Sequence, residues 1–219
     1  MNFSNYDGLF YKRRLPHAYE QSHPVFITWR LKFCLPQYII EQLNEQKAKH
    51  EHEIEHLSEE YKLLQRYQFS KKQFNYYDEQ LTEDKTLPDL LNRDELAEVV
   101  KATLHYHDTH KYSLHAYCIM TNHVHAVLTP LCDNIEQKKT LSGITKSLKG
   151  FTAREINKLT GSSGSVWARE SYDHIVRNEA EFARIISYVA NNPVKAGLVK
   201  QWQDWKFTWI EESLQDIVT

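Results

Sequence analysis

The sequence predicts a mixed fold of helices and β-strands built as one medium-sized domain. Apolar and polar residues alternate over residues 24–33, a strand–turn–strand pattern covers residues 112–130, and apolar residues recur at three-and-four spacing in several long stretches. With 219 residues, 41% of them hydrophobic, the chain is large enough for one ordinary core. We therefore expect a single domain over residues 1–219, with a helical insertion at about 41–90.

The first regular element is a strand over residues 24–33, in which Phe26, Thr28, Arg30 and Lys32 share one side. Large apolar residues occupy the other side, so this pattern is typical of a half-buried strand, here with a partly basic open face. From about residue 37 the pattern becomes helical and continues into the charged run EQKAKHEHEIEHLSEE. Such a run predicts a solvent-exposed or coiled helical extension.

Residues 68–92 have the composition of a loop with short turns, and an amphipathic helix follows over residues 94–107, capped by Asn92 or Asp94. Beyond the hairpin at 112–130, further helices are predicted over residues 135–159 and 179–199. Pro193 should end or kink the last helix near Asn192. A short strand or extended segment lies between these two helices.

The charge of the chain is distributed unevenly although its net value is only −2. Residues 41–100 hold eight basic against fifteen acidic side chains, whereas residues 138–200 hold eleven against five. A basic half beside an acidic middle fits a nucleic-acid-binding face. A merely solvated surface fits equally well on charge alone.

No apolar run is long enough for a membrane span, and the N-terminus lacks a signal-peptide pattern. We expect a cytoplasmic, nucleoid-associated protein that does not contact membranes. The three cysteines, an odd number with wide spacing, are expected to be reduced thiols in or near the core.

The most informative stretch is YSLHAYCIMTNHVHAVLTP, because it places His123 and His125 two residues apart on a predicted strand. Side chains alternate along a strand, so both imidazoles point to one face and can share a metal ion. The same spacing recurs in helix-like sequence, where residues two apart diverge by roughly 200°. These other copies are His50/His52 and His105/His107.

A second pattern lies more than sixty residues downstream, where Tyr188 and Asn192 are four residues apart in a predicted helix. That spacing stacks a phenol and an amide on one helix face. Two imidazoles and an oxygen ligand would hold a divalent ion with positions left for phosphate oxygens. A tyrosine nucleophile would conserve the energy of a broken phosphodiester bond as phosphotyrosine.

Two segments carry a resemblance to a known family. The segment IMTNHVHAVLTP resembles the HUH motif (His, bulky hydrophobic, His) of single-tyrosine transposases, and residues 167–199 resemble the C-terminal signature of REP-associated tyrosine transposases. The arm Arg13-Arg14-Leu-Pro-His, the strand near Val25 and the helix from Asp94 extend the match. The charged stretch at about 41–90 lies outside it and departs from the compact members.

The resemblance implies a ferredoxin-like α+β fold, in which helices pack on an antiparallel sheet that carries the histidines. It implies metal binding by His123, His125 and Asn192, and nucleophilic attack by Tyr188. It implies single-stranded or hairpin DNA as substrate, cleaved to a 5′-phosphotyrosine and a free 3′-hydroxyl during DNA transposition. The expected ion is Mg²⁺ or Mn²⁺, although imidazole ligands by softness favour Mn²⁺ or Zn²⁺ over Mg²⁺.

Basic side chains distributed over the chain are candidates for neutralising DNA phosphates. Trp167 is a candidate for stacking on a base, although a core position explains it better, and the protein is expected to act as a monomer or homodimer. The candidate phosphate-binding residues are Arg13, Arg14, Lys146, Lys149, Arg154, Arg169, Arg177 and Arg184.

Two alternatives stay open on sequence alone. One is a non-catalytic hairpin-DNA-binding protein, a domesticated relative that binds without cleaving. The other is a metal-dependent hydrolase that activates water, with Tyr188 as a hydrogen-bond donor. Tyr172 and Tyr117 are secondary candidates for the nucleophile, and Asp173 and His174 are candidates for a supporting role beside the substrate.

Overall fold

The computed structural model describes five segments, which are residues 9–12, 16–19, 23–83, 87–131 and 141–218. The chain divides into two compact units, one made of Met1–Lys32 with Asp89–Thr219 and the other of Phe33–Pro88. The larger unit contains the histidine pair and the tyrosine helix. Among the described residues, no helix is both long and apolar enough to cross a membrane.

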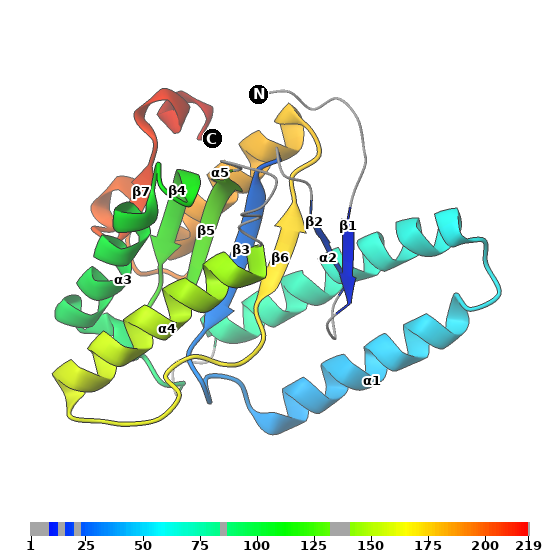
Figure 1. Ribbon diagram of the computed structural model, residues 1–219, viewed down its shortest axis with the longest axis horizontal. Helices are drawn as coiled ribbons and strands as arrows, with labels where there is room; N and C mark the ends of the chain where they lie inside the picture. Colours follow the sequence, from blue (N-terminus) through cyan, green and yellow to red (C-terminus); the bar gives the residue numbers. More distant parts are fainter. Residues whose placement is uncertain (1–8, 13–15, 20–22, 84–86, 132–140, 219) are drawn as a thin grey trace. The chain divides into compact units, whose positions relative to one another are not determined.

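The larger unit is built on a five-stranded antiparallel sheet with the strand order β6-β3-β5-β4-β7 (Figure 1). The two outer strands are short, which limits the exposed sheet edge. A separate antiparallel pair is formed by β1 (Leu9–Lys12) and β2 (Pro16–Tyr19). The sheet strands are β3 (Val25–Arg30), β4 (Tyr112–Ile119), β5 (His123–Pro130), β6 (Tyr172–Ile175) and β7 (Thr208–Ile210).

Strands β4 and β5 form the hairpin that the sequence predicts, with residues 120–122 between them. The pairing contains one irregularity. Leu114 lies opposite Leu128, but Ala116 lies opposite Val127, so His115 is an additional residue on β4. Beyond this bulge the register places Cys118 beside His125.

Three helices pack on the sheet, α3 (Asp94–His107), α4 (Leu141–Thr160) and α5 (Glu179–Lys195). Helices α3 and α4 lie together in front of the sheet in Figure 1, and α5 lies behind it. The predicted α+β architecture, an antiparallel sheet with helices packed on it, is therefore confirmed. Short 3₁₀ turns complete this unit at Leu90–Asn92, Trp202–Asp204 and Glu212–Ile217.

The expected open face of the first strand is wrong. Phe26 and Thr28 are buried together with the apolar residues of the opposite side, and only Arg30 is partly exposed. The reason is that α5 covers this face, as the ring contact between Phe26 and Tyr188 shows. β3 is a central strand with both faces covered.

Two details of helix ends also differ from expectation. The N-cap of α3 is Arg93, whose side chain makes no capping hydrogen bond, so neither Asn92 nor Asp94 is the cap. The acidic residues Asp94 and Glu95 lie instead in the first turn, where they favour the positive end of the helix dipole. For α4, the predicted residues 135–140 lie outside the described residues, and the helix is described from Leu141.

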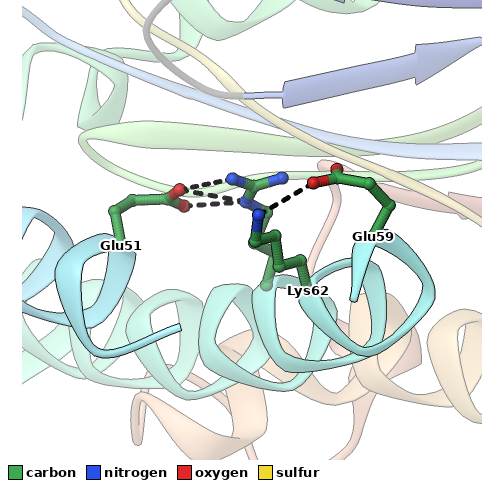
Figure 2. Close-up of polar contacts among 4 residues, drawn as sticks. Glu51, Glu59 and Lys62 are labelled. Atoms are coloured by element: carbon green, nitrogen blue, oxygen red, sulfur yellow. Dashed lines mark hydrogen bonds and ion pairs between the residues drawn. The ribbon is translucent and has the colours of Figure 1, made fainter. Parts of the chain in front are cut away.

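The smaller unit is a pair of helices, α1 (Gln37–Glu53) and α2 (Glu59–Glu83). The guanidinium of Arg66 donates to both carboxylate oxygens of Glu51, with N–O distances of 2.7–3.0 Å, and holds the pKa of that carboxyl below its usual value. Figure 2 shows Glu51 with Glu59 and Lys62, which form a second ion pair within α2 at 2.8 Å. The predicted helical character of the charged run is confirmed.

The expectation of a loop over residues 68–92 is wrong, because α2 continues to Glu83. Residues 59–83 contain no glycine or proline that would end a helix. Phe74 and Leu81, seven residues apart, are buried on one helical stripe. Polar residues between them diluted the periodic signal.

Candidate functional site

The two strand histidines converge on one point. His123 and His125 lie on β5 with 1% and 0% of their surface exposed, and their Nε2 atoms are 3.0 Å apart. They point to the sheet face covered by α5, as strand alternation requires. The sequence prediction that this pair can aim both rings at one ion is therefore consistent with the geometry.

Each ring is held through its other nitrogen. Nδ1 of His123 lies 2.6 Å from the side-chain oxygen of Asn122, and Nδ1 of His125 lies 2.7 Å from the hydroxyl of Thr28. Thr28 lies on β3 directly opposite His125. All four side chains are buried, so the two Nε2 atoms are the ring atoms left to face a shared ligand.

These contacts fit a divalent ion. Protein-bound metals are commonly held by the Nε2 atom of a neutral imidazole whose other nitrogen is hydrogen-bonded, which fixes the orientation of the ring. Two ligands at a right angle, each about 2.1 Å from an ion, lie about 3.0 Å apart. The observed spacing of the Nε2 atoms therefore suits two adjacent metal ligands.

Tyr188 lies against the histidine pair. Its ring centroid is 5.5 Å from that of His125 and 5.8 Å from that of Phe26, with both contacts edge-on. Phe26 also stacks on His125 at 5.6 Å. Residues 63 positions apart in the chain, His125 and Tyr188, are thus brought into contact by the packing of α5 on the sheet.

The ends of α5 are defined by local hydrogen bonds that fix where Tyr188 lies along the helix. The side chain of Asn178 accepts from the backbone N–H of Glu181 at 2.9 Å and caps the N-terminus. At the other end, Gly197 has a positive φ of 69°, and Leu198 N–H donates to Pro193 O at 2.9 Å. This pattern is a Schellman ending, and the glycine permits its left-handed residue.

The expectation that Pro193 ends or kinks the helix near Asn192 is wrong in position, because α5 continues to Lys195. A proline removes one backbone hydrogen bond, and this loss is small in the last turn, where the Schellman bonds supply alternatives. Asn192 consequently has helical geometry and shares a face with Tyr188.

Asn192 is 1% exposed, and neither polar atom of its side chain has a hydrogen-bond partner in the part of the chain that the structure describes. A buried amide without partners costs about 1–3 kcal/mol. Such a cost is typical of groups retained for function, and an amide oxygen is a suitable ligand for Mg²⁺ or Mn²⁺. The observation supports Asn192 as a third ligand.

His174 and Glu181 form a pair that joins β6 to α5. Their Nε2 and Oε1 atoms are 3.1 Å apart, and the second carboxylate oxygen of Glu181 accepts the backbone N–H of Arg177 at 3.0 Å. Glu181 is buried. These contacts position the start of the tyrosine helix relative to the sheet, which is a structural role.

The candidate DNA-binding residues do not gather at the histidine pair. Lys146, Lys149 and Arg154 lie on α4, which packs on the sheet face opposite to the one that carries the histidines. Burial lowers the pKa of Lys149 to about 8, and its ammonium donates to the carbonyl of Arg169 at 3.0 Å. Arg169 itself is exposed.

Four candidates remain. Arg184 is exposed on α5 and Arg177 is partly buried just before that helix, so both lie on the segment that carries Tyr188. Arg13 and Arg14 lie outside the described residues. All eight basic residues keep the status of predicted phosphate contacts.

The aromatic alternatives separate clearly. Trp167 is 3% exposed, donates from Nε1 to the hydroxyl of Thr152 at 2.9 Å and contacts Trp29 edge-on, so it is a core residue. Tyr117 is buried, and its hydroxyl lies 3.1 Å from Nε2 of His105 on the opposite sheet face. Tyr172 is partly exposed and contacts Phe26 at 6.2 Å on the histidine face.

Sequence reasoning missed the roles of Thr28 and Asn122. Thr28 had the pattern of an open strand face and Asn122 that of a turn residue. The available signal was positional, since Asn122 directly precedes the pair and Thr28 is a polar residue inside an otherwise large apolar strand. Recognising the second signal requires the β3–β5 register, which only the fold provides.

An antiparallel sheet with a convergent histidine pair, packed against a helix that carries a tyrosine, is the arrangement implied by the resemblance to single-tyrosine transposases. Residues 85–192 match the model of the family described as Transposase IS200 like. This match includes both histidines, Tyr188 and Asn192. The predicted resemblance to REP-associated tyrosine transposases is confirmed by this match and by the relatives below.

Two curated relatives are similar over less than half of this chain. A protein of Haemophilus influenzae assigned by name to the REP-associated tyrosine transposases is 28% identical over 101 residues, covering 42% of this chain and 56% of its own. The REP-associated tyrosine transposase of Escherichia coli K12 is 26% identical over 102 residues, covering 44% and 53%. The chain thus spans about half the length of the curated relatives it matches.

A solved structure supports the fold over a longer range. A REP-associated tyrosine transposase bound to a REP hairpin superposes with a TM-score of 0.51 at 14% sequence identity. The similarity covers 95% of this chain and 89% of that one. At this identity the comparison establishes the fold.

Proposed function

We propose that this protein is a metal-dependent transposase that cuts single-stranded or hairpin DNA and transfers the cut strand through a 5′-phosphotyrosine intermediate. The observation that carries the proposal is the contact of Tyr188 with His125, whose Nε2 atom lies 3.0 Å from that of His123. The family match and the hairpin-bound structural neighbour support DNA as the substrate.

In this mechanism the phenol oxygen of Tyr188 attacks the phosphorus of a DNA phosphodiester after losing its proton to solvent. The new Oη–P bond forms as the bond from phosphorus to the 3′ oxygen breaks, and that oxygen takes a proton to become a free 3′-hydroxyl. Attack by a 3′-hydroxyl on the phosphotyrosine reverses these changes and joins strands. No external energy source is needed because the ester bond is conserved.

The chain's own residues divide the work. His123, His125 and Asn192 would hold Mg²⁺ or Mn²⁺, which when bound withdraws charge from the phosphate oxygens. The hydrogen bonds from Asn122 and Thr28 keep the two rings aimed. Phe26 packs against both His125 and Tyr188 and keeps nucleophile and ligand in register.

The test uses labelled single-stranded oligonucleotides that carry the inverted repeats flanking the gene, incubated with the full chain and Mn²⁺. A denaturing gel should show DNA attached covalently to wild-type protein and to Tyr172→Phe, the matched control on the same sheet face. Tyr188→Phe should give no adduct. An adduct that persists in Tyr188→Phe would refute the nucleophile.

The same gel separates the two alternatives. A non-catalytic hairpin-binding protein would retard the oligonucleotide on a native gel and leave it intact on the denaturing one. A hydrolase using activated water would shorten the DNA without attaching it to protein.

A further inference from the structure

We propose that Thr28 is a positioning residue which lets His125 change tautomer when a metal ion binds, whereas Asn122 holds His123 in one tautomer throughout. This inference rests on the metal role in the proposed function. It concerns two neutral hydrogen-bonding partners of the rings, and it assigns different tasks to them.

The proton on His123 follows from its partner. The side-chain oxygen of Asn122, 2.6 Å from Nδ1 of His123, can only accept a hydrogen bond. Nδ1 of His123 therefore carries the proton, and Nε2 of the neutral ring presents a lone pair. That lone pair faces Nε2 of His125 at 3.0 Å.

Two lone pairs cannot face each other at that distance without repulsion. In the metal-free protein, Nε2 of His125 must accordingly carry a proton and donate it to His123. Nδ1 of His125 is then an acceptor, and the hydroxyl of Thr28 donates to it at 2.7 Å. One assignment of protons satisfies all three contacts, from Thr28 through both rings to Asn122.

Metal binding requires a different arrangement on one ring only. His123 already presents a lone pair at Nε2, so it can bind an ion unchanged. His125 must free its Nε2, which a neutral ring does by carrying the proton on Nδ1 instead. The Nδ1–H group then needs an acceptor, and the hydroxyl of Thr28 supplies one by rotating.

A hydroxyl is the only uncharged protein group that donates or accepts with the same atom. A carbonyl oxygen or an amide N–H at this position would favour one tautomer of His125 and oppose the other. Thr28 is fully buried opposite His125, so bulk water does not replace its role. The structure thus places an adaptable partner beside the ring that must change and a fixed partner beside the ring that does not.

The first measurement is Mn²⁺ binding, followed by the electron paramagnetic resonance signal of free Mn²⁺, for the full chain and three variants. Thr28→Val keeps the side-chain shape and removes the hydroxyl, and should weaken binding about 10–100-fold. Thr28→Ser restores the hydroxyl and should restore most of the affinity. Thr103→Val, a buried threonine on α3 that bonds to the carbonyl of Val99, should bind like wild type.

The second measurement needs no variant. Nitrogen-15 NMR of the histidine side chains should place the protons of the metal-free protein on Nδ1 of His123 and Nε2 of His125. Addition of diamagnetic Zn²⁺ should move the His125 proton to Nδ1 and leave His123 unchanged. A His125 that already carries its proton on Nδ1 without metal, or a His123 protonated on Nε2, would overturn the inference.

The outcomes also separate this inference from the function it rests on. Equal Mn²⁺ affinity of wild type and Thr28→Val would remove the role of Thr28 and leave metal binding intact. Wild type that binds neither ion would overturn the metal site and this inference together. Wild type that binds metal with the expected tautomers but forms no DNA adduct would overturn only the proposed reaction.

Discussion

Two histidine pairs of this protein share the same spacing and have different environments. On β5, His123 and His125 face one way and bring their Nε2 atoms within 3.0 Å. On α3, His105 lies 3.1 Å from the hydroxyl of Tyr117, while His107 accepts from the ammonium of Lys111 at 3.4 Å. The helical rings therefore serve separate partners.

The difference teaches that spacing has chemical meaning only with its secondary structure. A two-residue step keeps a side chain on the same face of a strand and rotates it by roughly 200° around a helix. The pair on α1 behaves like the one on α3, since His50 stacks on Phe69 at 4.1 Å and His52 pairs with Glu55 on the surface. Only the strand pair has the geometry of a shared ligand site among these three.

The largest expected effect is the loss of DNA attachment when the strand pair is broken. His123→Ala removes a ligand, and the ion's stabilisation of the reacting phosphate is worth several kcal/mol, or about a thousandfold in rate. The adduct formed per minute on a denaturing gel measures it. His105→Ala is the matched control and should retain wild-type activity; undiminished cleavage by His123→Ala would contradict the metal role.

Metal removal should have a comparable effect without changing the chain. Treatment with EDTA should abolish the adduct, and added Mn²⁺ should restore it in wild type and in His105→Ala to the same extent. The measurement is adduct yield against Mn²⁺ concentration. A protein that attaches DNA equally well in EDTA would not use the strand pair as a metal site.

A smaller effect of opposite sign in stability and function is expected at Asn192. Replacing its unpartnered amide by leucine removes a burial cost of about 1–3 kcal/mol, and each kcal/mol raises Tm by about 2–4 °C. The same change should weaken Mn²⁺ binding about tenfold, or about 1.4 kcal/mol. Thermal unfolding and Mn²⁺ titration of Asn192→Leu test both halves, and a lower Tm with unchanged Mn²⁺ affinity would make Asn192 a structural residue.

The smallest effect concerns the helical pair. Burial lowers the pKa of both His105 and His107 below the ordinary value of about 6.5. The unfolded chain therefore binds protons that the folded one does not, and stability is lost as pH falls through the unfolded pKa towards the folded one. Replacing both by glutamine should flatten the fall of Tm between about pH 7 and pH 5, by a few degrees at most.

Much of the larger unit could be predicted from sequence because its elements carry strong local signals. The helix at 94–107 and the hairpin at 112–130 have clear periodicity, and the resemblance linked Tyr188 to the histidines before any fold was known. The true length of α2 was hidden because Phe74 and Leu81 are separated by polar residues. The partners Thr28 and Asn122 were missed because cross-strand register cannot be obtained from one strand's own pattern.

The proposals that stay untested are the assignment of a single domain over residues 1–219 and the individual phosphate contacts. The position of Lys146, Lys149 and Arg154 on α4 separates them from the face that carries the histidines. Charge counting along the sequence could not detect this, because it does not tell which face of a sheet a helix covers.

The bulge at His115 makes the chemistry of this site depend on a single residue of chain length. Because side chains alternate along a strand, deletion of that residue would exchange the faces of everything beyond it on β4 or before it. The small thiol of Cys118, now beside His125, would give way to a neighbour such as the ring of Tyr117 or the branched side chain of Ile119. Room for an ion next to His125 is thus encoded in a strand that supplies none of its ligands.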